Sequence, residues 1–148
     1  STAEPEIAPY PFTTKGVIVG HIQDDWRKYQ IIDTPGLLDR EFDERNDIEK
    51  QAVLALRYLT DVMLFVLDPS ETCGFPMAVQ EKLLKTVKKG FPGVTIIEAE
   101  SKCDVYKSGG DRLCFSAQTG EEMDVLTGRI MEELRSIARR KDAEAELE

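Results

Sequence analysis

The sequence predicts an α/β fold, because short apolar runs typical of strands alternate along the chain with stretches of helical periodicity. The run DVMLFVLD at residues 61–68 is apolar on both faces, as expected of a strand near the centre of a parallel sheet that helices cover. Apolar residues within 45–60 and within 120–140 recur on one stripe at helical spacing. No internal repeat interrupts this alternation, so we expect one globular domain over residues 1–148.

The other expected elements follow from turn and breaker residues. Two strand-like runs, 16–23 and 27–33, flank Asp24 and Asp25 and predict an antiparallel hairpin. Residues 1–14 carry three prolines and few apolar positions, which predicts an extended, irregular leader. The remaining expectations are a helix at 76–89, strands at 94–100 and 112–115, and a tail at 142–148 that frays or is a cloning scar.

Composition limits the classes of function. The 148 residues carry a formal net charge of −9, so the broad basic surface that binds a nucleic-acid backbone is not expected. The three cysteines form neither a paired framework nor a metal-binding spacing, which fits a reducing compartment. No stretch approaches the roughly 20 apolar residues of a membrane span, and the first residues lack the layout of a signal peptide. We therefore expect a soluble, cytosolic protein without a membrane partner.

Polar side chains follow four expected strands, at the edge where ligands of open α/β sheets bind. The four loops are DTPG at 33–36, DPSE at 68–71, SKCD at 101–104 and SA at 116–117. In the first loop, Asp33 can hold a magnesium-bound water and the glycine N–H can meet a phosphate. In the third loop, Asp104 can accept paired donors from N1–H and the exocyclic amine of guanine, a pattern that adenine lacks.

Structural roles are the alternative for several of these residues. Asp33 and Asp68 can each cap a turn at the end of a strand, and this interpretation is favoured for Asp68 but not for Asp33. The single histidine, His21, is interpreted as a surface or edge residue of the hairpin, and the cysteines as ordinary buried thiols.

The order of the motifs resembles that of the GTPase signature motifs. The segments YPFTTKGVIVG at 10–20, IIDTPGLLDR at 31–40 and DPSETCGF at 68–75 are similar to the nucleolar GTP-binding protein (Nog) family of the Obg-like translation-factor GTPases, in archaeal or eukaryotic form. The resemblance covers nearly the whole chain and is strongest from Pro5 to Phe75. It implies that the chain is a GTPase (G) domain.

The fold that the resemblance implies is a three-layer G domain of the P-loop NTPase type, mostly parallel, with an antiparallel hairpin strand. No G-x-x-x-x-G-K-[ST] motif occurs in the sequence, so we expect the first strand and the P-loop to be missing. That first strand separates the strands ending at Asp33 and Asp68, so both are expected to be edges facing a gap. Few residues connect Asp104 with Ser116, so the crossover helix is expected to be missing or reduced.

The resemblance also implies the phosphate and switch residues, which are Thr13, Thr14, Asp33, Thr34, Pro35, Gly36 and Leu37. Within the switch-one leader at 1–14, Thr14 is implied to bind magnesium directly, and Asp33 to reach the same ion through water. The N–H of Gly36 is implied to sense the terminal phosphate. Leu37 stands where many GTPases keep a water-positioning glutamine, so hydrolysis is expected to be slow or to depend on another group, and no catalytic residue is identified.

The guanine site is implied in the same way. Lys102 is implied to lie along the base, and Asp104 to read guanine. Ala117 would give its N–H to the guanine carbonyl, and Ser116 would brace the loop. Ser101 replaces the asparagine that usually begins the motif, so its tethering of neighbouring loops is expected to be weaker.

The function that the resemblance implies is a magnesium-dependent GTPase that hydrolyses GTP to GDP and phosphate, as a switch in the biogenesis of the large ribosomal subunit. Its implied partners are GTP or GDP and a pre-ribosomal large subunit or ribosomal RNA–protein particle. Its implied location is cytoplasmic in an archaeon or nucleolar in a eukaryote. Without a P-loop the chain alone is expected to be weak or inactive as an enzyme.

Two other classes of function remain open. The first is a non-catalytic α/β interaction module that does not bind nucleotide by itself. The second is a phosphatase with Asp33 as a phosphoryl-accepting nucleophile. This second possibility is disfavoured, because its pattern needs another aspartate at the position of Pro35.

Overall fold

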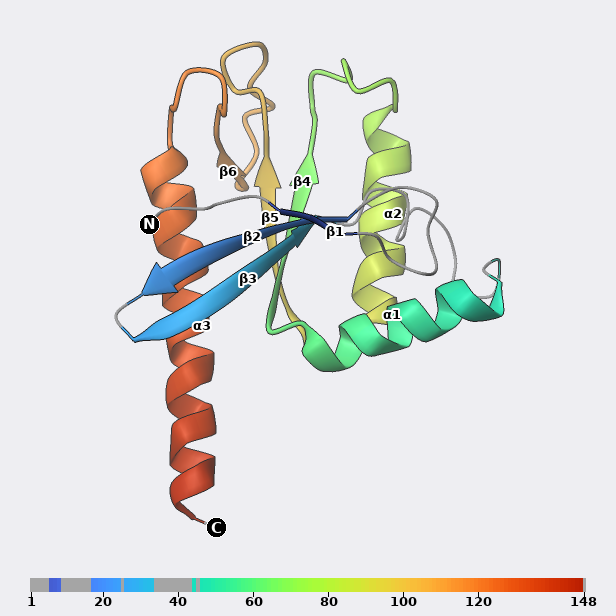
Figure 1. Ribbon diagram of the computed structural model, residues 1–148. Helices are drawn as coiled ribbons and strands as arrows, with labels where there is room; N and C mark the ends of the chain where they lie inside the picture. Colours follow the sequence, from blue (N-terminus) through green and yellow to red (C-terminus); the bar gives the residue numbers. More distant parts are fainter. Residues whose placement is uncertain (1–5, 9–16, 25, 34–43, 45, 148) are drawn as a thin grey trace. The chain divides into compact units, whose positions relative to one another are not determined.

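The computed structural model describes residues 6–8, 17–24, 26–33, 44 and 46–147, and strands and helices alternate in it as the sequence predicts (Figure 1). The chain divides into two compact units, Ser1–Tyr58 and Leu59–Glu148. Each unit has its own three-stranded sheet, and the two sheets share no strand within the described residues.

The first unit contains an antiparallel sheet in the order β1-β2-β3. Strands β2 (Val17–Asp24) and β3 (Arg27–Asp33) form the predicted hairpin, in a register that places His21 opposite Gln30. Strand β1 (Glu6–Ala8) pairs with β2, so part of the leader expected to be irregular is a strand. Pairing satisfies backbone groups that an extended segment beside a sheet edge otherwise leaves to water.

Helix α1 (Asp47–Leu59) confirms the predicted amphipathic helix, and a side-chain cap defines its start. The Glu49 N–H donates to Asn46 Oδ1 at 2.8 Å, and Asn46 Nδ2 donates to Glu49 Oε1 at 3.2 Å. The first contact is an N-cap, which satisfies one of the backbone N–H groups that a helix start leaves unpaired, and the second joins the two side chains. The buried side chains of α1 are Ala52, Val53 and Leu56.

The second unit is built on a parallel sheet in the order β4-β5-β6. Strand β4 (Val62–Leu67) pairs with β5 (Thr95–Glu100), and β5 pairs with the short β6 (Leu113–Cys114). Helix α2 (Met77–Gly90) connects β4 with β5, and α3 (Met123–Glu146) follows β6. The predicted succession of strands and helices in this half of the chain is confirmed.

Helices α2 and α3 lie on opposite faces of the parallel sheet, which gives this unit three layers (Figure 1). On the α3 face, Ala99, Phe115 and Leu126 form a buried cluster, against which Leu113, Met123 and Ile130 pack. On the opposite face, the buried residues of α2 are Leu84 and Val87. The core therefore consists of strand residues held between two amphipathic helices.

The connection from β5 to β6 contains no helix, as the sequence predicts, and a polar cluster lies over that part of the sheet instead. Arg112 Nη1 and Nη2 donate to Glu81 of α2 at 2.5 and 2.8 Å, and Arg112 Nε donates to Glu98 of β5 at 2.9 Å. Glu100 also pairs with Arg112 at 3.6 Å and accepts from Ser108 Oγ at 2.5 Å. The hydrogen bonds to Glu81 raise the pKa of Arg112 above its usual range.

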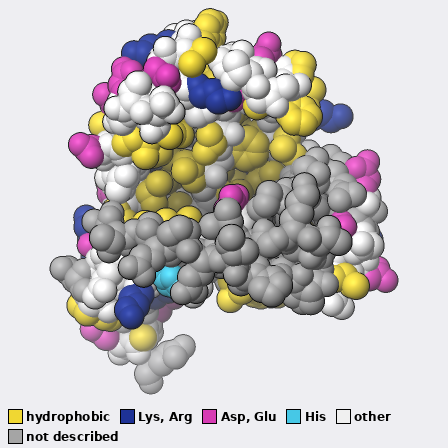
Figure 2. Space-filling model, turned by 45° about the horizontal axis from the view of Figure 1, so that its top comes forward, with side chains coloured by type: hydrophobic (Ala, Val, Ile, Leu, Met, Phe, Trp, Pro, Cys, Tyr) yellow, Lys and Arg dark blue, Asp and Glu magenta, His cyan; other side chains and the backbone are white. Residues whose placement is uncertain are grey.

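Within the described residues, β3 and β4 are both edge strands, as expected for the strands that end at Asp33 and Asp68. Leu64 and Val66 of β4 are 37% and 47% exposed. Both pair with residues on the α3 face of β5, yet α3 does not bury them. Figure 2 shows hydrophobic side chains gathered on one face of the molecule, and these two are among the large apolar side chains that stay exposed.

Helix α3 continues to Glu146. Residues 142–146, which we expected to be frayed, are therefore helical. The segment DAEAE is rich in alanine and glutamate, and the helix propensity of these residues outweighs their exposure. Lys141 Nζ also pairs with Asp61 Oδ1 at 2.6 Å. Although α3 is the longest described helix, neither it nor any other described helix is long and apolar enough to cross a membrane.

The substitution Leu126→Ala tests the α3 face of the core. Leu126 is 4% exposed, so its truncation leaves a cavity, and we expect a loss of about 2–4 kcal/mol in the free energy of unfolding. Its neighbour Val125 is 51% exposed, and Val125→Ala should change stability by less than about 0.5 kcal/mol. Urea unfolding followed by circular dichroism measures both, and equal losses would contradict this packing.

Candidate functional site

The ends of β4, β5 and β6 meet at one edge of the parallel sheet, where direct hydrogen bonds join the loops that follow them. Ser101 donates to the carbonyl of Leu67 through its N–H at 2.8 Å and through its hydroxyl at 3.1 Å. The Phe115 N–H donates to the carbonyl of Glu100 at 2.9 Å. Loops 68–76, 101–112 and 115–122 therefore start side by side, which makes this edge the candidate site.

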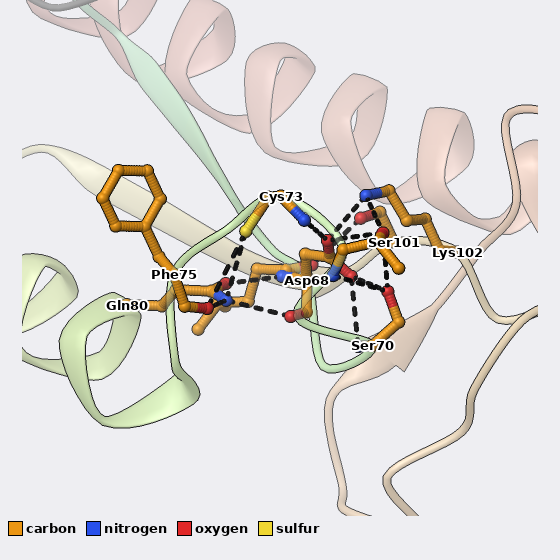
Figure 3. A network of polar contacts seen from close by, with 9 residues as sticks. Asp68, Ser70, Cys73, Phe75, Gln80, Ser101 and Lys102 are labelled. Atoms are coloured by element: carbon orange, nitrogen blue, oxygen red, sulfur yellow. Dashed lines mark hydrogen bonds and ion pairs between the residues drawn. The ribbon is translucent and has the colours of Figure 1, made fainter.

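Asp68 is the centre of the first loop (Figure 3). Its Oδ1 accepts from the N–H and the hydroxyl of Ser70 at 3.1 and 2.5 Å. Its Oδ2 accepts from the Cys73 N–H at 2.9 Å, from Thr72 Oγ1 at 3.3 Å and from Lys102 Nζ at 2.6 Å. Asp68 thus caps its own turn, which is the role that the sequence analysis favoured for it. In addition it forms an ion pair with Lys102 of the next loop.

The ionised form of Asp68 is strongly favoured. Burial raises the pKa of this carboxyl, but hydrogen bonds from Lys102, Ser70 and the Cys73 N–H outweigh burial and hold the pKa well below its usual range. Asp68 is only 6% exposed, so these donors replace nearly all of its water. A carboxylate with this many donors stays charged at any pH near neutrality.

Gln80 of α2 fastens the same loop to the helix that follows it. Its Oε1 accepts from the Asp68 N–H at 2.6 Å, and its Nε2 donates to the carbonyls of Asp68 and Phe75, each at 2.9 Å. Glu71 Oε2 accepts from the N–H of Met77 at 2.6 Å, where α2 begins. A carboxylate at this position is favourable, because helix N-termini carry unpaired N–H groups and a partial positive charge.

The second loop carries the predicted guanine-reading residues. Lys102 has a φ of 59°, in the left-handed region, and both Val105 and Tyr106 donate their N–H groups to its carbonyl. The Cys103 N–H donates to the carbonyl of Phe115 at 3.1 Å. Asp104, in the middle of this turn, is exposed. The loop therefore holds the Asp104 backbone in place and leaves the carboxylate accessible.

The third loop is closed around Ser116, which is fully buried. Its hydroxyl accepts from the Thr119 N–H at 3.1 Å, and its carbonyl accepts from the Gly120 N–H at 2.9 Å. Its own N–H donates to the carbonyl of Glu121 at 3.0 Å. Ala117 is exposed at the apex. Ser116 thus braces the loop that presents Ala117.

Glu121 joins the second and third loops and was missed by the sequence interpretation. Its carboxylate accepts from Lys107 Nζ at 2.9 Å and from Cys103 Sγ at 3.3 Å. The Lys107 and Cys103 hydrogen bonds lower the pKa of Glu121, whereas burial and the hydrogen bond to Glu121 raise the pKa of the Cys103 thiol. These contacts and the backbone hydrogen bond from Cys103 to Phe115 tie the second loop to the third.

The structure brings together five of the predicted site residues, which are Ser101, Lys102, Asp104, Ser116 and Ala117. Asp33 ends β3 in the other unit, where its side chain is exposed. The predicted residues Thr13, Thr14, Thr34, Pro35, Gly36 and Leu37 lie outside the described residues.

A magnesium ion was expected at Asp33 and Thr14, of which only Asp33 is described. Its exposed carboxylate is a ligand type that magnesium accepts, directly or through water. The described residues contain no group of three or more histidine, cysteine, aspartate or glutamate side chains placed to hold a metal ion. The donor chemistry at Asp33 fits an ion that keeps most of its ligands as water and phosphate oxygen.

The chain is similar to known proteins of one family in both sequence and structure. The sequence model described as nucleolar GTP-binding protein 1 (NOG1) matches residues 47–104. A crystal structure of a putative nucleolar GTP-binding protein 1 from Plasmodium falciparum superposes with a TM-score of 0.74 at 31% identity, covering 84% of this chain and 73% of that chain. The chain belongs to the nucleolar GTP-binding protein family.

Another relative is similar to the chain in sequence, and a second solved structure is similar to it in fold. An uncharacterized protein of Methanocaldococcus jannaschii is 50% identical over 103 residues, which are 70% of this chain and 28% of that protein. The G domain of the FeoB iron transporter of T. maritima has a TM-score of 0.65 at 21% identity, covering 88% of this chain and 83% of that domain. The α/β architecture is therefore that of a G domain, as predicted.

The chain matches only part of its longer relatives. Relatives called nucleolar GTP-binding protein 1 are 36–43% identical, and the chain spans 16–21% of their length. It covers 28% of the Methanocaldococcus protein. The nucleolar GTP-binding protein family is thus established from a segment of these proteins.

The buried ion pair predicts a pH dependence of stability. Because the folded pKa of Asp68 is depressed, its stabilisation is fully present above its unfolded pKa of about 4 and is lost progressively as pH falls from there toward the much lower folded pKa. We expect Asp68→Asn to cost about 1–3 kcal/mol at pH 7 and clearly less at pH 2. Urea unfolding at both pH values measures this, with exposed Asp111→Asn as the control. A loss independent of pH would contradict the ion pair.

Proposed function

We propose that this chain is the switch and base-reading part of a magnesium-dependent GTPase, which binds GTP and GDP. The observation that carries the proposal is the fastening of loops 101–112 and 115–122 to each other, with Asp104 and Ala117 left exposed. The family supports it, because relatives bear the name nucleolar GTP-binding protein 1.

Guanine is the base that fits these loops. Asp104 supplies two acceptor oxygens, which match the N1–H and the exocyclic amine of guanine. Ala117 is exposed, and it lies in a loop whose other amide groups at Ser116, Thr119 and Gly120 are already used within the loop. The Ala117 N–H would meet the guanine carbonyl. Adenine offers neither the paired donors nor the carbonyl, so it should be rejected.

The phosphate end of the nucleotide is assigned to the switch residues. Asp33 and Thr14 would hold magnesium, which neutralises phosphate charge when bound, and the N–H of Gly36 would meet the terminal phosphate. Leu37 cannot orient water by hydrogen bonding. Hydrolysis of GTP to GDP and phosphate would therefore be slow in the chain alone, or would depend on another group.

The biological role is proposed from the names of the relatives. Nucleolar GTP-binding protein 1 carries a location in its name, and the nucleolus is where eukaryotic ribosomes are assembled. We assign the parent protein to the biogenesis of the large ribosomal subunit, with a pre-ribosomal RNA–protein particle as its partner. Its location would be nucleolar in a eukaryote and cytoplasmic in an archaeon.

Calorimetric titration of the chain with GDP, IDP and ADP in the presence of magnesium tests the proposal. We expect GDP to bind best, IDP about tenfold or more weakly because it lacks the exocyclic amine, and ADP not measurably. Asp104→Ala should abolish the preference for GDP over IDP. Asp111→Asn, which changes an exposed carboxylate in the same loop, should leave GDP binding unchanged.

The alternative is a non-catalytic interaction module, favoured by the lack of a G-x-x-x-x-G-K-[ST] motif in the sequence. That motif supplies most of the phosphate donors in P-loop proteins. If neither GDP nor IDP produces heat in the titration, the interaction module is the better description of this chain. Equal binding of GDP and ADP would remove the base-reading role of Asp104.

A further inference from the structure

We propose that Asp68 is a positioning residue for guanine recognition, which holds the ammonium group of Lys102 so that the lysine stem lies ready along the base. The assignment rests on the proposed function, since Lys102 meets a base only when a guanine nucleotide is bound. Asp68 itself would not touch the nucleotide. It would act through Lys102, from the end of the neighbouring strand.

The Lys102 side chain is held at its far end. Its Nζ lies 2.6 Å from Asp68 Oδ2 and 2.6 Å from Thr72 Oγ1, both in the loop that follows β4 (Figure 3). The same Asp68 oxygen also accepts the Cys73 N–H at 2.9 Å, so the carboxylate cannot swing away with the lysine. The acceptor is thus fixed by its own loop before the lysine reaches it.

The near end of Lys102 is fixed as well. Its φ of 59° is unusual for a residue with a side chain, and the surrounding hydrogen bonds maintain it. Glu71, in the loop that supplies the carboxylate, has the same φ of 59°. Each of the two loops that the ion pair joins thus holds one residue in an unfavourable backbone conformation. This indicates that the surrounding contacts fix both loops where they meet.

Between these two fixed ends, the four-carbon stem of Lys102 remains available to a ligand. The Lys102 side chain is 39% exposed, whereas that of Asp68 is 8% exposed. A lysine stem can cover an apolar surface while its charged end is held elsewhere. An ordered stem binds a flat base without the large loss of rotamer freedom that a free lysine undergoes.

The ion pair also limits what Lys102 can bind. Its positive charge is matched by a carboxylate that stays ionised, so the lysine is not free to act as a phosphate ligand. In P-loop proteins a different lysine reaches the phosphates, as a point charge. The geometry therefore assigns Lys102 to the base and not to the phosphates. Loss of Asp68 should weaken recognition of the guanosine part alone.

Calorimetry of four forms of the chain, with GDP and with pyrophosphate in the presence of magnesium, tests this role. They are the unsubstituted chain, Asp68→Asn, Lys102→Met and the double variant. Asparagine keeps one oxygen for Ser70 and removes the ion pair, but it also removes the acceptor of the Cys73 N–H. The Lys102→Met background separates the two losses, because the Cys73 contact is lost with or without the lysine. Glu98→Gln is the matched control, because Glu98 is also a carboxylate paired with lysine and arginine, but on the face toward α2.

We expect Asp68→Asn to weaken GDP binding about tenfold and to leave pyrophosphate binding unchanged. In the Lys102→Met background the same substitution should cost nothing further, because Asp68 acts only through Lys102. Hydrogen exchange of the Cys103, Val105 and Tyr106 amides should also become faster in Asp68→Asn. Glu98→Gln should change neither GDP binding nor this exchange.

Several results would overturn the assignment. A loss of the same size with and without Lys102 would show a purely structural role for Asp68. Unchanged or tighter GDP binding by Asp68→Asn would show that the ion pair competes with the nucleotide. In both cases the unsubstituted chain still binds GDP, so the proposed function stands. If the unsubstituted chain fails to bind GDP, the proposed function is overturned and this assignment with it.

Discussion

The carboxylate of Asp68 is almost wholly removed from water at the end of β4, and a charge in that position is tolerated only when donors surround it. Those donors come from its own turn and from Lys102 on the next loop. The turn that satisfies Asp68 also places Glu71 at the first amide of α2 and Gln80 against the loop backbone. The entry into α2 and the orientation of the loop at 101–112 therefore depend on one buried charge.

A second constraint arises from the short connection between β5 and β6. A parallel connection usually includes a helix that covers the sheet, and here no helix occurs between these strands. The α2-facing side of β5 accordingly carries Glu98 and Glu100, and Arg112 links both to Glu81. Charged side chains with matched partners tolerate water on a sheet face that apolar side chains would need a helix to cover.

Periodicity and turn residues predicted the hairpin, the helices, most of the strands and the order of the loops that follow them, because these features are local in the sequence. The partners of Asp68, Arg112 and Glu121 could not be predicted, since each lies in another element and no spacing rule relates them. The pairing of β1 with β2 was not predicted, because the prolines around this short strand indicated an irregular segment. The helical structure of residues 142–146 was not predicted, because their charge indicated a frayed tail, whereas alanine and glutamate have high helix propensity.

The helix-free connection also bears on the order in which the parallel sheet assembles. Residues Ala99 and Leu113 pair across β5 and β6, and the chain between them is less than half as long as that between the paired Val62 and Thr95. Each doubling of a loop adds about 0.6 kcal/mol to the entropy cost of closing it. We therefore expect β6 to dock on β5 before β4 does, so that the nascent sheet grows from its C-terminal edge toward β4.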